Sequence, residues 1–211
     1  MHKTPEAWHE VARARSENVL KLFERDCAKL AKERIDDETR RVMFCFLSDP
    51  YQPLEGELHL TRHGIEIAAQ YGIKIDILTK GDGKLIEQDL PLMLKSQTHL
   101  GLTLSFINDA SRCEWEPMAS SVQSRLRILQ KAHEMGIYTW VSMEPVIIPE
   151  EALAVIRKAH DCVDFWKVGK LNHNKEVERS VDWKKFLRDA VELLELYGCK
   201  YYIKEDLRRA G

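Results

Sequence analysis

The chain has 211 residues and a formal net charge of −2, with 44% hydrophobic and 31% charged residues. This length is enough for one well-buried domain and too short for two of ordinary size. The balanced charge excludes a broad basic surface of the kind that binds nucleic acid through its phosphates. No apolar run approaches the roughly 20 residues that span a bilayer, and the first residues lack the apolar core of a secretory signal. We therefore expect a soluble, cytoplasmic protein.

Cysteine and histidine spacing gives no metal motif. The five cysteines are Cys27, Cys45, Cys113, Cys162 and Cys199. They contain neither CxxC nor CxxxCxxC, which predicts reduced, buried thiols for most of them rather than a disulfide framework or a self-contained metal site. The eight histidines show neither HxH nor HExxH spacing, so the sequence does not favour a histidine metal site.

The chain begins with a helical segment, residues 1–35, that starts at Thr4-Pro5-Glu6 and has an expected break near Ser16. Short apolar runs that end at turn residues then predict six strands, at 42–47, 73–79, 100–107, 137–143, 163–168 and 200–203. Segments of helical period lie between them at 58–71, 121–135, 149–160 and 181–197. Three of these end at glycine, as helices commonly do. We expect one domain over 1–211, with an alternating β/α core at 42–207.

Strands that alternate with helices of this length imply parallel pairing and right-handed crossovers. Two architectures fit this order: an open doubly wound sheet, and a (β/α) barrel that is complete or partial. No glycine-rich phosphate loop follows any predicted strand, which weakens the nucleotide-binding open sheet. In a parallel barrel the active site lies at the carboxyl ends of the strands, so polar residues at those ends become the candidates.

Polar side chains occur at the predicted strand ends. They are Ser48, Asp49, Lys80, Ser105, Asn108, Glu144, Lys167, Lys170, Asn172 and Lys204. Turns attract Ser, Asp and Asn for local reasons, but lysine is a poor turn former, and its recurrence favours a functional rim. Lys80 and Lys170 suit either Schiff-base chemistry or the binding of a carboxylate. Glu144 suits a ligand contact or an ion pair with Lys170.

The strand ends also resemble a known family. The string SDPYQPLE at 48–55, followed by LTR at 60–62 and ILTKG at 77–81, is similar to the radical SAM superfamily. The nearest branch is the spore photoproduct lyase-related, DNA repair photolyase-like group. The similarity continues through WEP at 115–117, AHE at 132–134, WVSMEPVI at 140–147, WKVGKLN at 166–172, DW at 182–183 and YYIK at 201–204, and covers roughly residues 16–207.

This resemblance implies a partial parallel (β/α) barrel that binds S-adenosylmethionine and a [4Fe–4S] cluster. Reductive cleavage of S-adenosylmethionine would give a 5′-deoxyadenosyl radical that acts on an unknown substrate, with nucleic acid suggested by family analogy alone. By position, Ser48 and Asp49 meet the methionyl amino group, Lys80 reaches the methionyl carboxylate, and Ser105 approaches the cosubstrate. The resemblance places the remaining rim residues where substrate enters. These are Asn108, Glu144, Lys167, Lys170, Asn172 and Lys204.

The sequence departs from the family in lacking CxxxCxxC, the cysteine motif that holds the cluster. We interpret the chain as a radical SAM core without its first β-strand and cluster loop, inactive alone and not expected to hold the cluster by itself. Cys45 is a candidate hydrogen-donating thiol, as in the photoproduct lyases, although a packing role is favoured. A barrel opened by one strand exposes the edge at 42–47, so self-association is expected unless the N-terminal helix covers that edge.

Two further functions stay open at this point. One is a non-catalytic barrel that binds a SAM-like ligand or nucleic acid. The other is a lysine-dependent, aldolase-type lyase that uses Lys80 or Lys170.

Overall fold

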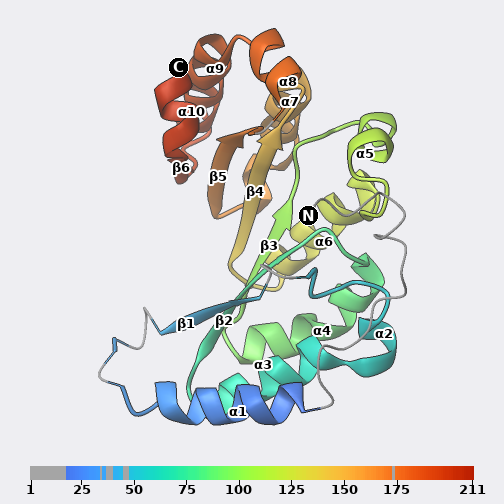
Figure 1. The fold of residues 1–211 in the computed structure, drawn as a ribbon, viewed down its shortest axis with the longest axis vertical. Coiled ribbons are helices and arrows are strands. Elements are labelled where there is room, and N and C mark those ends of the chain that lie inside the picture. Colours follow the sequence, from blue (N-terminus) through green and yellow to red (C-terminus); the bar gives the residue numbers. More distant parts are fainter. Residues whose placement is uncertain (1–17, 34, 37–39, 45–47, 173) are drawn as a thin grey trace.

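A computed structural model describes residues 18–211 except 34, 37–39, 45–47 and 173 (Figure 1). One six-stranded sheet runs through it in the order β1-β2-β3-β4-β5-β6, and all five neighbouring strand pairs are parallel. The strands are β1 (Arg41–Phe44), β2 (Lys74–Thr79), β3 (His99–Thr103), β4 (Thr139–Val146), β5 (Phe165–Lys170) and β6 (Tyr201–Ile203). The α/β class with about six parallel strands is therefore confirmed.

Helices precede, connect and follow the strands. They are α1 (Val19–Leu30), α2 (Glu55–Leu58), α3 (Leu60–Gln70), α4 (Gly83–Lys95), α5 (Asp109–Trp115), α6 (Val122–Glu134), α7 (Pro149–Ala159), α8 (Lys175–Ser180), α9 (Trp183–Leu196) and α10 (Glu205–Ala210), with a 3₁₀ turn at His160–Cys162. Four of them, α3, α6, α7 and α9, match the predicted helical segments. The short helices α2, α5, α8 and α10 were not predicted, because one or two turns are too few to show a helical period. The longer helix α4 was not among the predicted segments either.

The helix-covered face of the sheet is apolar, because every second strand residue points to it. Buried side chains on this face are Ile75, Ile77, Leu100, Leu102, Val141, Met143, Trp166, Val168 and Ile203. They pack against buried residues of the helices, such as Ile65 of α3 and Ile128 of α6. Each such burial contributes about 1.5–3 kcal/mol, so this layer supplies most of the driving force for the sheet.

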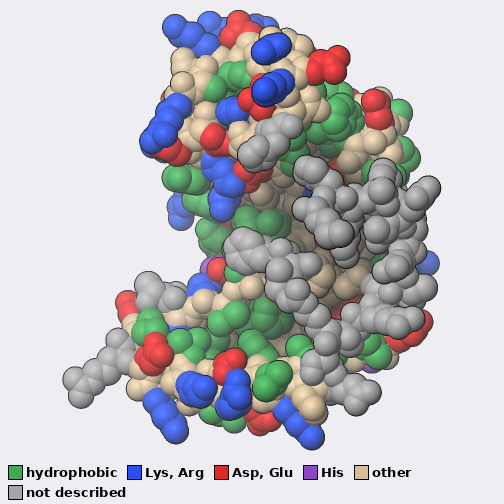
Figure 2. Space-filling view, viewed as in Figure 1, with side chains coloured by type: hydrophobic (Ala, Val, Ile, Leu, Met, Phe, Trp, Pro, Cys, Tyr) green, Lys and Arg blue, Asp and Glu red, His purple; other side chains and the backbone are tan. Residues whose placement is uncertain are grey.

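The opposite face of the sheet, called here the inner face, carries the alternate residues. Gly101 identifies it, because a Cβ built at Gly101 would lie 2.1 Å from the Trp140 indole of the neighbouring strand. Strand register then places Thr103, Ser142 and Lys167 side by side one step further toward the carboxyl ends. Figure 2 shows the molecule hollowed between the part that carries β1 and the part that carries α9 and α10.

Helix α1 belongs to the outer helical layer. It packs on α3, and the Phe23 ring meets the Phe44 ring of β1 edge-on at 5.5 Å. The contact lies on the helix-covered face of β1, which is an edge strand of the sheet. Residues 45–47, which include Cys45 and form the end of the predicted strand 42–47, lie outside the described residues. Residues 1–17 also lie outside them. No helix within the described ranges is long and apolar enough to cross a bilayer.

Candidate functional site

The loop after β1 is held by a buried tyrosine. Tyr51 is fully buried, and its hydroxyl donates to Asp89 Oδ2 of α4 at 3.0 Å, while Arg62 Nη1 contacts Asp89 Oδ1 at 2.5 Å. Burial, which outweighs these two partners, raises the pKa of Asp89. The carboxylate of Glu55 accepts hydrogen bonds from the backbone N–H groups of Thr61 and Arg62 at the start of α3. The SDPYQPLE string is thus an anchored loop at the sheet rim.

Asp49 joins this loop to the end of β2. Its Oδ1 accepts from the Tyr51 N–H at 2.8 Å and from the Thr79 hydroxyl at 2.5 Å, and its Oδ2 accepts from the Lys80 N–H at 2.7 Å. Ser48 lies exposed beside it. A cavity of about 90 Å³ adjoins both residues, which is room for a few waters and too little for a nucleoside. Asp49 therefore holds the loop after β1 against the end of β2.

A chain of charges follows β2 and β3. Lys80 Nζ lies 2.6 Å from Glu116 Oε1, and Glu116 Oε2 lies 3.1 Å from Arg125 Nη1, which also donates to the Thr103 carbonyl at 2.6 Å. The side chain of Arg125 is 1% exposed and that of Glu116 is 7% exposed. Burial lowers the pKa of Arg125, and the neighbouring Glu116 carboxylate counteracts it.

Several polar atoms at this rim have no hydrogen-bond partner within the described residues. They are Ser105 Oγ, Ser120 Oγ, and Nε and Nη2 of Arg125. Ser105, which follows β3, is fully buried. A buried donor without a partner is costly and rare, so its presence needs an explanation such as a bound ligand or water. Arg125 was not predicted as a site residue, although it lies between the buried positions Val122 and Ile128 on one face of α6.

The predicted residue Asn108 has a local role. Its Oδ1 accepts from the Ala110 N–H at 2.9 Å and caps α5, and its own N–H donates to Glu151 Oε2 at 2.9 Å. Glu151 also accepts from the Ser111 hydroxyl, so it fastens the β3–α5 loop to α7. The side chain of Asn108 thus forms a helix cap at the start of α5.

Glu144 and Lys204 form an ion pair on the inner face. The pair crosses β5 at Gly169, where a Cβ would lie 2.9 Å from Lys204 Cδ and 3.0 Å from Glu144 Cδ. The alternative in which Glu144 pairs with Lys170 is wrong, because Lys170 follows Gly169 and contacts another group of side chains. Glycine at 169 leaves the space through which Lys204 reaches Glu144.

Lys170 lies at the end of β5 in a polar cluster with α8. Its Nζ is 2.9 Å from Asn172 Oδ1 and 3.6 Å from Glu178 Oε2, and it lies over the Trp183 ring at 5.9 Å. Asn172 in turn donates to Asp206 Oδ2 at 2.5 Å. Lys170 contacts Glu178 and Lys80 contacts Glu116, so each of the two lysines proposed for Schiff-base chemistry has a carboxylate beside it.

The described thiols do not fit an iron–sulfur cluster. Cys27 and Cys162 are buried, Cys199 is half-buried and Cys113 is exposed, each as a free cysteine. Within the described ranges, no group of three or more His, Cys, Asp or Glu side chains could hold a metal ion. Burial raises the pKa of Cys162 to about 11, which leaves it a neutral thiol at physiological pH.

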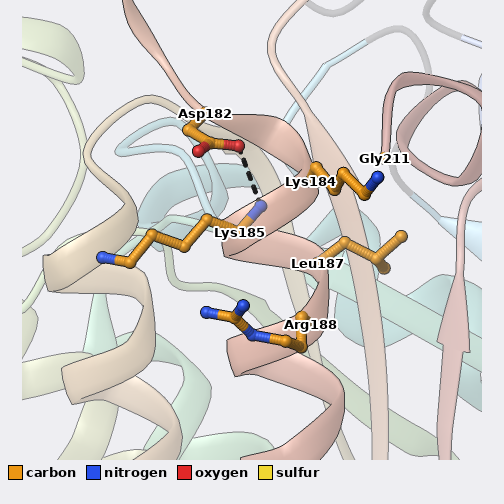
Figure 3. A pocket seen from close by; sticks show the side chains of 6 residues that line it. All are labelled: Asp182, Lys184, Lys185, Leu187, Arg188 and Gly211. Atoms are coloured by element: carbon orange, nitrogen blue, oxygen red, sulfur yellow. Dashed lines mark hydrogen bonds between the residues drawn. The ribbon is translucent and has the colours of Figure 1, made fainter.

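A larger surface depression of about 500 Å³ lies along α9 beside the end of α10 (Figure 3). It is lined by Asp182, Lys184, Lys185, Leu187, Arg188 and Gly211. Asp182 caps α9 by accepting from the Lys185 N–H at 2.9 Å. This depression contains none of the predicted site residues, and we assign the candidate site to the strand-end rim and the inner face.

The sequence matches no family model. It is 31% identical over 113 residues to an uncharacterized protein, ORF301, of Acidianus two-tailed virus, a match that covers 52% of this chain and 36% of that protein. The chain therefore spans about a third of the curated relative that it matches.

Two similarities to solved structures extend further. A domain of pyruvate-formate lyase-activating enzyme from Bacteroides vulgatus superposes with a TM-score of 0.56 and 11% identity, covering 77% of this chain and 98% of that domain. SuiB from Streptococcus suis, bound to S-adenosylmethionine, superposes with a TM-score of 0.66 and 11% identity, covering 96% of this chain and 47% of SuiB. The fold is that of a partial radical SAM-type barrel. At this identity the similarity shows the fold alone, and it gives no support to the spore photoproduct lyase branch.

Proposed function

We propose that the chain binds S-adenosylmethionine at the carboxyl-end rim of its barrel, as a protein of the radical SAM type. The observation that carries the proposal is the set of buried, unpartnered donors at this rim, Ser105 Oγ and Nε and Nη2 of Arg125, within the described residues. Arg125 is joined through Glu116 to Lys80, whose side chain is about one-third exposed. Donors of this kind are suited to a ligand that carries a carboxylate and ribose hydroxyls.

Each rim residue has a defined task in this proposal. Lys80 would hold the methionyl carboxylate, since an ammonium has three donors and Glu116 engages one of them. Ser48 and the backbone of the loop fastened by Asp49 would receive the methionyl amino group. The Ser105 hydroxyl would bind the adenosyl part. Glu116 is a positioning residue, because it contacts both Lys80 and the buried Arg125.

Bound S-adenosylmethionine supplies a sulfonium centre whose carbon–sulfur bond one-electron reduction can cleave. The described thiols do not fit the cluster that would deliver the electron, so the proposal concerns cosubstrate binding by this chain. What its own residues do is bind and orient the ligand. The curved sheet behind them keeps one side of the ligand out of water.

Isothermal titration calorimetry of the full chain with S-adenosylmethionine tests the proposal. We expect saturable binding, and we expect Lys80→Met to weaken it by about 1.5–3 kcal/mol, the value of a hydrogen bond to a charged group. Lys80→Arg keeps the charge and should lose less.

Lys95→Met is the matched control, since Lys95 is an exposed lysine at the end of α4. Circular dichroism of each variant reports that it is folded. The proposal is wrong if the folded parent shows no saturable binding, or if Lys80→Met and Lys95→Met bind equally well.

A further inference from the structure

The inner face is built in layers that follow from strand register. Gly101, Trp140 and Phe165 are in register and form a mostly apolar layer near the amino ends of the strands. The next layer toward the carboxyl ends contains Thr103, Ser142, Lys167 and Tyr202, which are register partners across β3 to β6. Above it lie Glu144, Gly169 and Lys204. The middle layer therefore presents two aliphatic hydroxyls, an ammonium and a phenol in one row.

Lys167 differs from the other lysines of the predicted rim. Lys80, Lys170 and Lys204 each contact a carboxylate: Glu116, Glu178 and Glu144 respectively. Within the part of the chain that the structure describes, the ammonium of Lys167 has no ion-pair or hydrogen-bond partner.

Its neighbours on the inner face are Ser142, which is 4% exposed, and Tyr202, which is 43% exposed. The hydroxyls of Thr103 and Ser142 likewise make no hydrogen bond to another described residue. Among the described residues, the row thus combines one cation and two hydroxyl donors that have no partner.

The charges around this row select the type of anion. On β4, β5 and β6, Glu144 and Lys204 neutralise each other, so Lys167 contributes one net positive charge there. Beside Thr103, the chain of Lys80, Glu116 and Arg125 contains two cations and one anion, so the row is positive on both sides. This charge favours an anion, and a planar carboxylate can accept from Lys167 through one oxygen and from the two hydroxyls through the other. The neighbouring layer, with Trp140 and Phe165, suits an apolar or aromatic body attached to the acid.

We infer that Lys167, Ser142 and Thr103 form a carboxylate-binding site on the inner face, which holds the acidic group of a substrate with an apolar or aromatic body. Lys167 supplies the charge and a donor, and the two hydroxyls donate to the second carboxylate oxygen. The inference deepens the proposed function by naming a substrate class. It rests on the proposed function only in treating the bound acid as a substrate of the protein. Binding of the acid itself is a property of the chain alone.

The test uses benzoate as the probe and the full chain with its lysines reductively methylated with ¹³C. The Lys167 signal is identified as the one missing from the spectrum of Lys167→Arg. We expect that signal to shift saturably with benzoate at constant ionic strength. Ligand-observed NMR on unmodified protein should show that Lys167→Met weakens benzoate binding at least about tenfold and Ser142→Ala about threefold or more, as expected for loss of charged and neutral hydrogen bonds.

Lys95→Met is the control variant and should bind benzoate like the parent. A Lys167 signal that responds only to ionic strength overturns the inference. Inorganic phosphate that binds Lys167 as tightly as benzoate would show that the site does not select carboxylates, and would also overturn it. S-adenosylmethionine is titrated separately on the same parent protein, so failure of the cosubstrate proposal and failure of the carboxylate site give different results.

Discussion

Individual buried charges at the rim are expensive, and their geometry shows how the chain accommodates them. Arg125 and Glu116 are almost fully enclosed, and their ion pair leaves Nε and Nη2 of Arg125 unpartnered within the described residues. Removing one member of a buried pair leaves an uncompensated charge, whereas replacing both by apolar groups is often neutral.

We therefore expect Glu116→Gln to destabilise the protein by about 3–5 kcal/mol, because Arg125 loses its buried counter-charge. The double variant Glu116→Leu with Arg125→Met should recover most of that loss. Urea unfolding followed by circular dichroism measures both changes. Equal stability of the parent and Glu116→Gln would mean that Arg125 is solvated in solution and that its burial has no energetic consequence.

Asp76 provides a pH-dependent contribution at the other end of the strands. Burial acts to raise its pKa, but hydrogen bonds from His99 and Arg41 at 3.0 and 2.6 Å reverse the effect and hold it below the usual range. Below a pH of about 4 the unfolded chain then binds more protons than the folded chain, so the contribution of Asp76 is lost as pH falls through that window.

Asp76→Asn should accordingly reduce the free energy of unfolding at pH 7, and the difference from the parent should shrink as the pH is lowered from about 4 toward 2.5. Urea titrations of both proteins at a series of pH values give this difference directly. A difference that is constant over the whole range would show that the charge of Asp76 makes no contribution.

At the scale of elements, the close contact of β3 and β4 depends on one missing side chain. The Trp140 indole occupies the space where a Cβ of Gly101 would be, at 2.1 Å. Trp140 is 7% exposed, so it has little room to move away. Glycine is required here for space rather than for backbone conformation, because Gly101 does not have a positive φ.

Gly101→Ala should cost about 1–3 kcal/mol, the usual range for overpacking, and should shift the tryptophan fluorescence of the folded state. Gly56→Ala is the matched control, because the nearest atom to its added Cβ would be 3.5 Å away in ordinary contact. Urea unfolding and the emission spectrum of each variant are the measurements. Equal effects of the two substitutions would exclude the proposed clash.

For the whole molecule, the sequence predicted the order and type of the strands well, because short runs rich in apolar residues, such as 73–79 and 100–107, and the glycines after helices are local signals. It did not predict partners across the sheet. The expected ligand contact of Asp49 stays a prediction, and the links from its carboxylate to the end of β2 were not foreseen. Lys204 rather than Lys170 pairs with Glu144. Those contacts depend on which face of the sheet each strand residue occupies. That face is determined by the pairing register of the strands, which is established only when the strands pair in the folded protein.

Parallel register also gives the hollow of the barrel a direction. Along the strand axis the inner face changes from the indole of Trp140, to the hydroxyl of Ser142 with the ammonium of Lys167, to the charge pair of Glu144 and Lys204. An amphiphilic ligand bound along this gradient has one favourable orientation. The opposite orientation would place its charged group against an aromatic ring and its apolar part among charged side chains. The inner face of β4, β5 and β6 therefore favours one of the two orientations of such a ligand.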